Sequence, residues 1–124
     1  IAVDSSTDFY LPNGAARKPD TSWVLKSRLA AFTGEERRKF LHLCPDFVVE
    51  LKSPSDRLPR QKAKMEEWIE NGAKLGWLLD PDTRTVYIYR PGTKPEELKG
   101  ADSVAGEGPV AGFVLDLAPI WRGL

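Results

Sequence analysis

The sequence predicts a single domain of mixed α and β structure, and three observations predict this class. Residues 46–53 form an apolar run that turns polar at every second position, which is typical of a strand. Residues 57–71 carry apolar side chains at helical spacing, and two segments rich in β-branched and aromatic residues follow at 75–80 and 85–89. The length of 124 residues suits one domain with one core.

Short strands are expected in the first quarter of the chain. Residues 3–11 are hydrophobic apart from a polar cluster at 4–8, which suits the turn of a hairpin between two strands. Residues 12–14, Pro-Asn-Gly, end the second of these strands. A third strand is expected within 19–25.

Short helical turns are expected before the central strand. Residues 27–32 and 34–41 have this pattern, and Thr33 with Glu36 has the spacing of a capping box.

The strand over 46–53 is followed by the one long helix. Pro54 ends the strand, Ser55 or Asp56 can cap the helix, and Gly72 stops it. Four apolar residues share the stripe that should face the core: Leu58, Met65, Trp68 and Ile69. The other side of the helix is charged and should face solvent.

The rest of the chain is expected to complete the sheet. Residues 75–80 and 85–89 should be strands joined by a hairpin-like connection at 81–84. Residues 91–108, rich in Gly, Pro, Glu and Lys, are predicted as a surface loop, and apolar residues within 113–121 should close the core.

Composition excludes several classes of protein. The chain has 18 Lys and Arg against 18 Asp and Glu, so it lacks the overall charge of a constitutive nucleic-acid binder, although a local basic patch could serve. Cys44 and His42 are single residues of their types, which excludes an internal disulfide and a zinc site made of Cys and His. No apolar run approaches a membrane span of about 20 residues, and no signal peptide opens the chain, so a cytoplasmic location is expected.

Three polar residues mark the predicted strand ends: Asp20, Glu50 and Lys52. Residues two apart in a strand project from the same face, about 7 Å apart, so Glu50 and Lys52 should lie side by side. If the strand of Asp20 is the neighbour, its carboxylate and that of Glu50 can converge on one hard cation such as Mg²⁺. As residue types alone, the three could equally form a structural ion pair at the sheet edge.

Two competing candidates are weaker. The tripeptide Glu-Leu-Lys occurs again at 97–99, where it lies in the predicted polar loop. Asp46 precedes Glu50 by four residues, about 13 Å along an extended strand, which is too far for one ion.

The same residues carry a family resemblance. Pro19-Asp20, then Glu50-Leu51-Lys52 at a strand end, then a helix with Gln61 and Lys64, resemble the PD-(D/E)XK nuclease superfamily, which has the restriction-endonuclease-like fold. The chain is similar to the Uma-two type of bacterial restriction endonucleases in five stretches: Pro-Asp-Phe-Val-Val-Glu-Leu-Lys-Ser-Pro-Ser-Asp (45–56), Lys64-Met65-Glu66, Asn71-Gly72, Gly76-Trp77-Leu78-Leu79-Asp80-Pro81 and Tyr89-Arg90-Pro91-Gly92.

The resemblance implies a central mixed β-sheet flanked by helices and cleavage of nucleic acid, DNA in the first place, with Mg²⁺ or Mn²⁺. It assigns metal ligation to Asp20, Glu50 and the Leu51 carbonyl, and makes Lys52 the residue that positions or activates the attacking water. Gln61 and Lys64 would be auxiliary, because many members of this type rely on a lysine from the following helix.

The chain also departs from the family pattern. Members generally have a helix with a glutamate before the first strand, whereas this chain starts at that strand with Ile1. We therefore expect 1–124 to be one nuclease-like domain truncated at its N-terminus, with an exposed apolar patch near its first strands and weakened metal binding.

Several alternatives stay open. A catalytically silent binding or dimerisation module is the second functional hypothesis, a phosphodiesterase acting on small nucleotides is the third, and a homodimer is compatible with each. Gln61 could be a satisfied buried amide or could orient water. The basic residues Arg57, Arg60, Lys62 and Lys64 could follow phosphates, or could be a solvated helix face paired with Glu66, Glu67 and Glu70.

Overall fold

A six-stranded mixed sheet organises the computed structural model, which describes residues 2–3, 8–17, 19–25, 28, 40–41 and 43–123. In spatial order its strands are β1 (Ala2–Val3), β4 (Thr21–Trp23), β6 (Phe47–Leu51), β7 (Leu75–Asp80), β8 (Thr85–Tyr89) and β9 (Glu96–Lys99). Only β6 and β7 are parallel, and every other neighbouring pair is antiparallel. A mixed sheet with a helix in the β6 to β7 crossover confirms the expected fold class.

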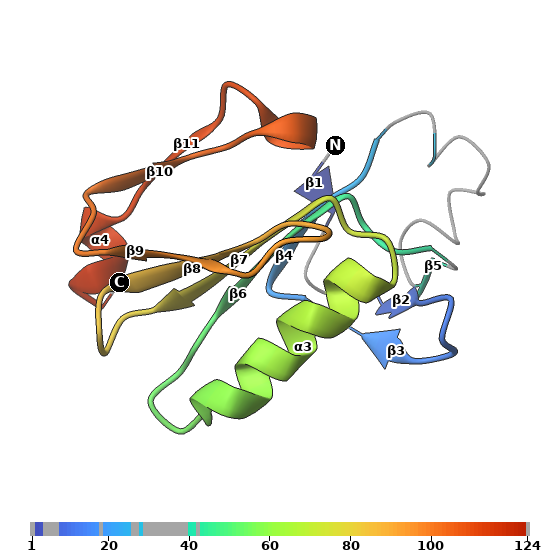
Figure 1. Ribbon diagram of the computed structural model, residues 1–124, viewed down its shortest axis with the longest axis horizontal. Helices are drawn as coiled ribbons and strands as arrows, with labels where there is room; N and C mark the ends of the chain where they lie inside the picture. Colours follow the sequence, from blue (N-terminus) through green and yellow to red (C-terminus); the bar gives the residue numbers. More distant parts are fainter. Residues whose placement is uncertain are drawn as a thin grey trace.

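Helix α3 (Leu58–Glu70) makes that crossover and covers one face of the sheet, whereas a hairpin of β10 (Ser103–Ala105) and β11 (Val114–Asp116) lies on the other side (Figure 1). A small sheet of β2 (Asp8–Tyr10), β3 (Ala16–Arg17) and β5 (Phe40–Leu41) lies beside the C-terminal end of α3. The short helices η1 (Gly108–Val110) and α4 (Ala118–Trp121) complete the described part.

Successive side chains of each strand point to opposite faces of the sheet, so the core has two parts, one on each face. Val48 and Leu78 face α3 and pack with Met65 and Trp68. The other set lies under the β10–β11 hairpin and includes Phe47, Leu75, Trp77, Leu79, Val86, Ile88, Val110 and Leu117. Strands β7 and β8 are buried along their whole length because both of their faces are covered.

Two glycines lie at contacts of α3. A Cβ at Gly76 would lie 2.7 Å from Met65 Cε and 3.3 Å from Val48 Cγ2, so a side chain there would require Met65 to shift. Gly72 has φ +121°, a conformation that L side chains rarely adopt, and it follows the C-cap Asn71. This confirms the predicted end of the helix.

The start of α3 differs from the prediction. The N-cap residue is Arg57, with no side-chain capping bond, whereas Ser55 or Asp56 was expected. The carboxylate of Asp56 instead accepts the Ser53 N–H at 2.9 Å and closes the turn that follows β6. Pro59 fills one of the first helical positions, where its missing N–H costs nothing.

Three other predictions fail at residue level. The segments on either side of the 4–8 cluster do not form a hairpin with each other, because β1 pairs with β4 and β2 pairs with β3 and β5. Residues 40–41 are strand β5 rather than helix, and the loop predicted over 91–108 contains β9 and β10. The other residues of the two helical turns expected at 27–32 and 34–41, except Arg28, lie outside the described residues, as does His42.

The single cysteine of the chain is buried in the core. Cys44 Sγ donates to the Trp68 carbonyl at 3.4 Å, and burial raises the thiol pKa to about 12. Among the described helices, none combines the length and apolar character that crossing a membrane requires.

Candidate active site

Strands β4 and β6 bring the two predicted carboxylates together. The antiparallel register pairs Thr21 with Val49, so Asp20, one residue before β4, stands opposite Glu50. The Asp20 N–H donates to Glu50 Oε1 at 2.8 Å, and the Leu51 N–H donates to Asp20 Oδ2 at 2.7 Å. Each carboxylate is thus held by the backbone of the other strand, and both are fixed at one point of the sheet.

Glu50 is buried, which is unusual for a side chain that can carry a charge. It is only 3% exposed, and its Oε2 makes no hydrogen bond with a described residue. The Lys64 ammonium lies 3.4 Å from this oxygen, as an ion pair that falls short of hydrogen-bond geometry. Burial raises the pKa of Glu50, while the Asp20 N–H and the charge of Lys64 oppose that rise in part. The oxygen is buried and has only the Lys64 ion pair among the described residues, which suits a site for a cation.

The two candidate lysines have different partners. Lys52 Nζ lies 3.1 Å from Asp82 Oδ2 and donates to the Ser53 carbonyl at 3.3 Å, and its side chain is 9% exposed. Lys64, from the second turn of α3, contacts Glu50 instead. Lys52 directly follows β6, but it is the helix lysine that reaches the Glu50 carboxylate.

Gln61 lies one turn before Lys64 on α3. It is 8% exposed and lies on the buried side of the helix with Met65 and Trp68.

The structure gives Asp46 a structural role. Its carboxylate accepts the Leu25 N–H at 3.0 Å and pairs with Arg28 Nη1 at 2.7 Å. Both oxygens of the Asp46 carboxylate are therefore engaged by Leu25 and Arg28.

Three aspartates near the site were missed by the sequence analysis. Asp82 holds Lys52, Asp56 closes the turn after β6, and Asp80 accepts the Asp82 N–H and the Thr83 hydroxyl, both at 3.1 Å. The signal was present, because Asp-Pro-Asp-Thr at 80–83 is a composition typical of Asx turns. From the sequence, these four residues predict only a turn between the two strands.

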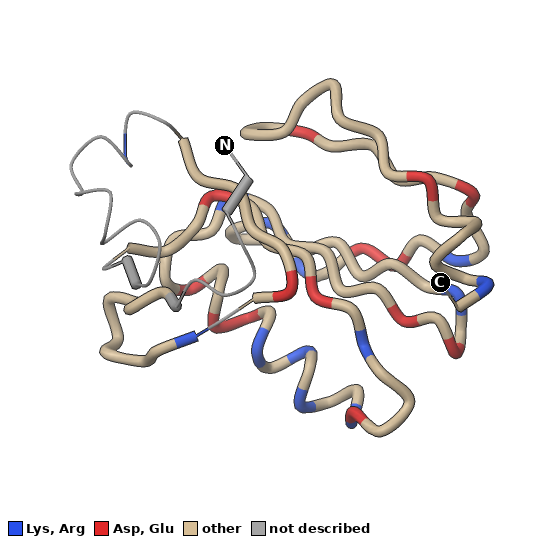
Figure 2. The backbone as a smooth tube through the Cα atoms, turned by 180° about the vertical axis from the view of Figure 1, so that it is seen from behind, with Lys and Arg blue, Asp and Glu red and all other residues tan. Residues whose placement is uncertain are grey.

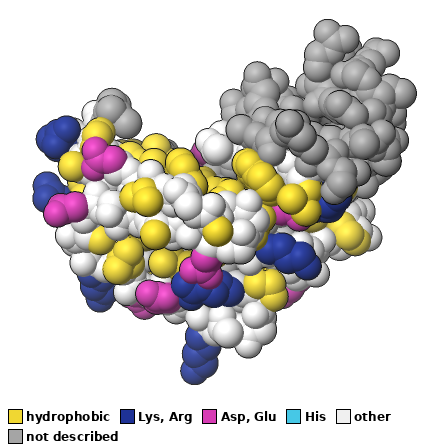
Figure 3. Space-filling view, turned by 90° about the horizontal axis from the view of Figure 1, so that it is seen from above, with side chains coloured by type: hydrophobic (Ala, Val, Ile, Leu, Met, Phe, Trp, Pro, Cys, Tyr) yellow, Lys and Arg dark blue, Asp and Glu magenta, His cyan; other side chains and the backbone are white. Residues whose placement is uncertain are grey.

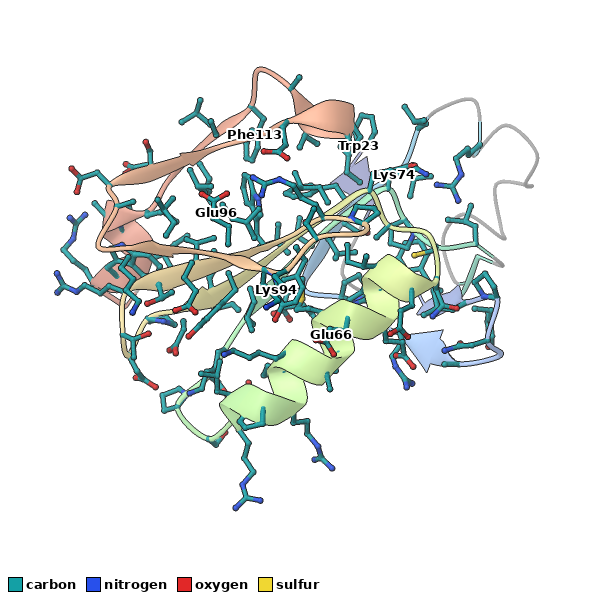
Figure 4. All side chains as sticks on the ribbon, in the orientation of Figure 1. Trp23, Glu66, Lys74, Lys94, Glu96 and Phe113 are labelled. Carbon is teal, nitrogen blue, oxygen red and sulfur yellow. The ribbon has the colours of Figure 1, made fainter. Side chains whose placement is uncertain are left out.

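An apolar groove lies on the sheet face opposite α3. Its volume is about 860 Å³, and it reaches from Asp20 and Leu51 to the β10–β11 hairpin. Leu51 and Phe113 line it and are 47% and 46% exposed. Trp23 and Phe113 lie on the hairpin side of the sheet, whereas Glu66 lies on the α3 side (Figure 4), and hydrophobic side chains gather on the hairpin side (Figure 3).

Comparison with known proteins identifies the family of the chain. The family model described as "Uma2: Putative restriction endonuclease" matches residues 1–118. The chain belongs to this family. The resemblance stated from the sequence is thereby confirmed, and the family description makes the chain a member of a nuclease family.

A solved relative confirms the fold. The chain is similar to a crystal structure described as that of a putative nuclease belonging to DUF820 from Anabaena variabilis, with a TM-score of 0.75 and 24% sequence identity. The match covers 98% of this chain and 67% of that one. No curated protein matches the chain significantly.

Proposed function

We propose that this Uma2 family domain hydrolyses phosphodiester bonds of nucleic acid, DNA in the first place, with a divalent cation held by Asp20 and Glu50. One observation carries the proposal: two carboxylates from neighbouring strands are fixed together by reciprocal backbone hydrogen bonds, and one oxygen of the buried Glu50 is left without a hydrogen bond. The nuclease description of the family supports it.

The residues present fit a hard divalent cation. Carboxylate and carbonyl oxygens are the ligands that Mg²⁺ and Mn²⁺ prefer, and Asp20, Glu50 and the Leu51 carbonyl supply three. No group of three or more Asp, Glu, His or Cys within the described residues could hold an ion, so a cation here would keep several waters. A divalent cation bound there would supply Lewis-acid stabilisation of the phosphoryl oxygens.

The chain's own residues would prepare the site in three ways. The backbone N–H groups of Asp20 and Leu51 orient the two carboxylates before anything binds. The Lys64 ammonium balances Glu50 when no cation is present and is free to face the phosphate when one is. Lys52, held by Asp82, keeps the turn after β7 against the end of β6.

The two lysines therefore compete for one role. The sequence gives Lys52 the first place, as the residue that positions or activates the attacking water. The contact with Glu50 favours Lys64, because only an ammonium close to the developing charge can stabilise it. Gln61 would assist from the neighbouring turn of α3.

Isosteric amides test the proposal. Asp20→Asn and Glu50→Gln keep an oxygen that can accept the backbone hydrogen bonds, but each removes a negative charge. Cleavage of plasmid, single-stranded, duplex and branched DNA should require Mg²⁺ or Mn²⁺ and should be lost in both variants. Mn²⁺ binding, followed by electron paramagnetic resonance, should be lost with it. Metal-independent cleavage, or full activity in either variant, would overturn the proposal.

A silent binding module is the second candidate. It is favoured by the ion pair of Lys64 with Glu50 and by the lack of a third acidic ligand in the described part of the chain. Under this hypothesis Mn²⁺ would not bind at Asp20 and Glu50, so the same resonance experiment separates the two candidates.

A further inference from the structure

Three basic side chains follow one flank of α3. Arg60 and Lys64 are four residues apart, which places them on one stripe of the helix, and Arg57 is the N-cap residue directly before the helix. Arg57 and Arg60 are exposed, and the Lys64 side chain is 40% exposed. We call these three residues the basic stripe. A hollow of about 490 Å³ lies against Arg57, Pro59 and Arg60.

The charges of α3 are arranged against the stability of the helix. The dipole of a helix favours acidic residues at its N-terminus and basic residues at its C-terminus. Here the first turn has no acidic residue and the last turn no basic one, while Glu66, Glu67 and Glu70 lie towards the C-terminal end. The helix dipole therefore does not account for the basic stripe.

Pairing along the helix does not account for it either. A solvated face would use Lys and Arg of α3 to pair with the glutamates of the following turn. In the structure Glu67 pairs with Arg17 of β3, and Lys64 pairs with Glu50 of β6. Arg57 and Arg60 form no ion pair with any described residue, so two exposed guanidinium groups are left uncompensated.

The stripe leads directly to the acidic pair. Lys64 is its last member and contacts Glu50, so the arginines continue from the candidate site along the edge of the molecule. Figure 2 shows Lys and Arg gathered on the N-terminal half of α3, next to the acidic ends of β4 and β6. Lys62 does not belong to the stripe, because its ammonium lies 4.5 Å from the centre of the Tyr87 ring on β8.

We propose that the basic stripe binds successive phosphates of one nucleic-acid strand beside the phosphate that is cut. This rests on the proposed function. The seven helical residues from Leu58 to Lys64 rise about 9 Å, the length of between two and three nucleotide steps in duplex DNA. Guanidinium groups match phosphate oxygens in geometry as well as charge, and such contacts carry no base information. The stripe would therefore give affinity without sequence preference.

Binding of a labelled single-stranded DNA oligonucleotide tests this, by fluorescence anisotropy in EDTA over a range of salt concentrations. Arg57→Glu with Arg60→Glu should weaken binding about tenfold or more at low salt. The slope of log affinity against log salt should fall by about 1.4, since each lost contact to a single strand removes about 0.7. The matched control reverses Lys94 and Lys99, two exposed residues near β9, with the same change in net charge.

A second variant guards against misfolding. Arg57→Gln with Arg60→Gln removes charges that oppose the helix dipole, so its Tm should not fall, while oligonucleotide affinity should still drop by several fold. Equal affinity and equal salt slope in the stripe and control variants would overturn the proposal. The same holds if the unmodified protein fails to bind the oligonucleotide at low salt.

The outcomes separate this proposal from the nuclease function. Metal-dependent cleavage with unchanged binding in the stripe variants would support the nuclease proposal and contradict the proposed role of the basic stripe. Binding that depends on the stripe, without any cleavage, would do the reverse.

Discussion

The same tripeptide, Glu-Leu-Lys, occurs at the end of β6, where Lys52 directly follows the strand, and again within β9, and it behaves differently in the two places. At the end of β6, Glu50 is 3% exposed and Lys52 has a side chain that is 9% exposed. In β9, the edge strand, Lys99 Nζ lies 3.7 Å from Glu97 Oε1, and these side chains are 73% and 49% exposed. The exposed pair is satisfied by itself and by water. The residues of the buried copy each have another partner.

The difference shows that the position of the tripeptide in the sheet determines which partners its charged side chains have. Glu50 and Lys52 do not pair with each other, because Glu50 is held by Asp20 and Lys64, and Lys52 by Asp82. Desolvation makes the charge of Glu50 costly, and a costly charge with an oxygen that makes no hydrogen bond attracts a cation. At the edge, water screens both charges, so no such demand arises.

Matched amides should show the largest contrast. Glu50→Gln should lower cleavage at least about 100-fold, the usual order for removing one charge-stabilising group, whereas Glu97→Gln should leave it unchanged. Plasmid cleavage in Mg²⁺ measures both. Equal activity of the two variants would mean that burial does not select the functional copy.

The second-largest effect on cleavage is expected from replacing the lysines. Lys64→Ala should reduce cleavage by about 100-fold, because this ammonium contacts Glu50, and Lys52→Ala should have the smaller effect. Lys99→Ala should have none. The order of Lys52 and Lys64 is the reverse of that expected from the sequence. If Lys52→Ala proves the more severe, the assignment based on the sequence is right; unfolding curves of each variant control for stability.

A smaller contrast should appear in the pH dependence of stability. Because burial raises the pKa of Glu50 in the folded chain, stability is favoured below the unfolded pKa and declines as pH rises through the folded pKa. Glu50→Gln imitates the protonated form. Without divalent cations the variant should be more stable than the parent at neutral pH, by about 1 kcal/mol, and equal to it at acid pH.

Urea unfolding at several pH values in EDTA measures this difference. Glu97→Gln provides the comparison and should show no gain at neutral pH, since its side chain is about half exposed. A Glu50→Gln variant that is less stable than the parent at neutral pH would show that Lys64 and the Asp20 N–H more than offset the burial.

Much of this contrast could be predicted from the sequence, for local reasons. The run from Phe47 to Leu51 is apolar except at Glu50, so a buried strand with a polar end follows from its pattern. The helix also follows, because Met65 and Trp68 repeat at helical spacing and Gly72 stops it. Asp20 could be placed opposite Glu50 only by assuming that the two strands are neighbours.

The predictions from the sequence that failed concern pairing between segments that are distant in the chain. Strand β9 has the sequence Glu-Glu-Leu-Lys, with Leu98 as its one apolar residue, and it forms because β8 offers an open edge, with Tyr87 opposite Glu97. The sequence predicted a loop there. Likewise, Lys52 finds Asp82 and Lys64 finds Glu50 through the β6 to β7 crossover, which no local pattern shows.

The smallest expected effect concerns what the second copy does. An exposed ion pair contributes about 0–1 kcal/mol, so replacing Glu97 and Lys99 together by Thr should change the free energy of unfolding by no more than that. The pair has a different consequence at the edge of a sheet, where charged side chains oppose pairing with another chain. The double variant should therefore associate at high protein concentration while keeping its cleavage rate, as measured by sedimentation velocity and the plasmid assay. If it stays as dispersed as the parent, the charges of β9 do not guard the edge.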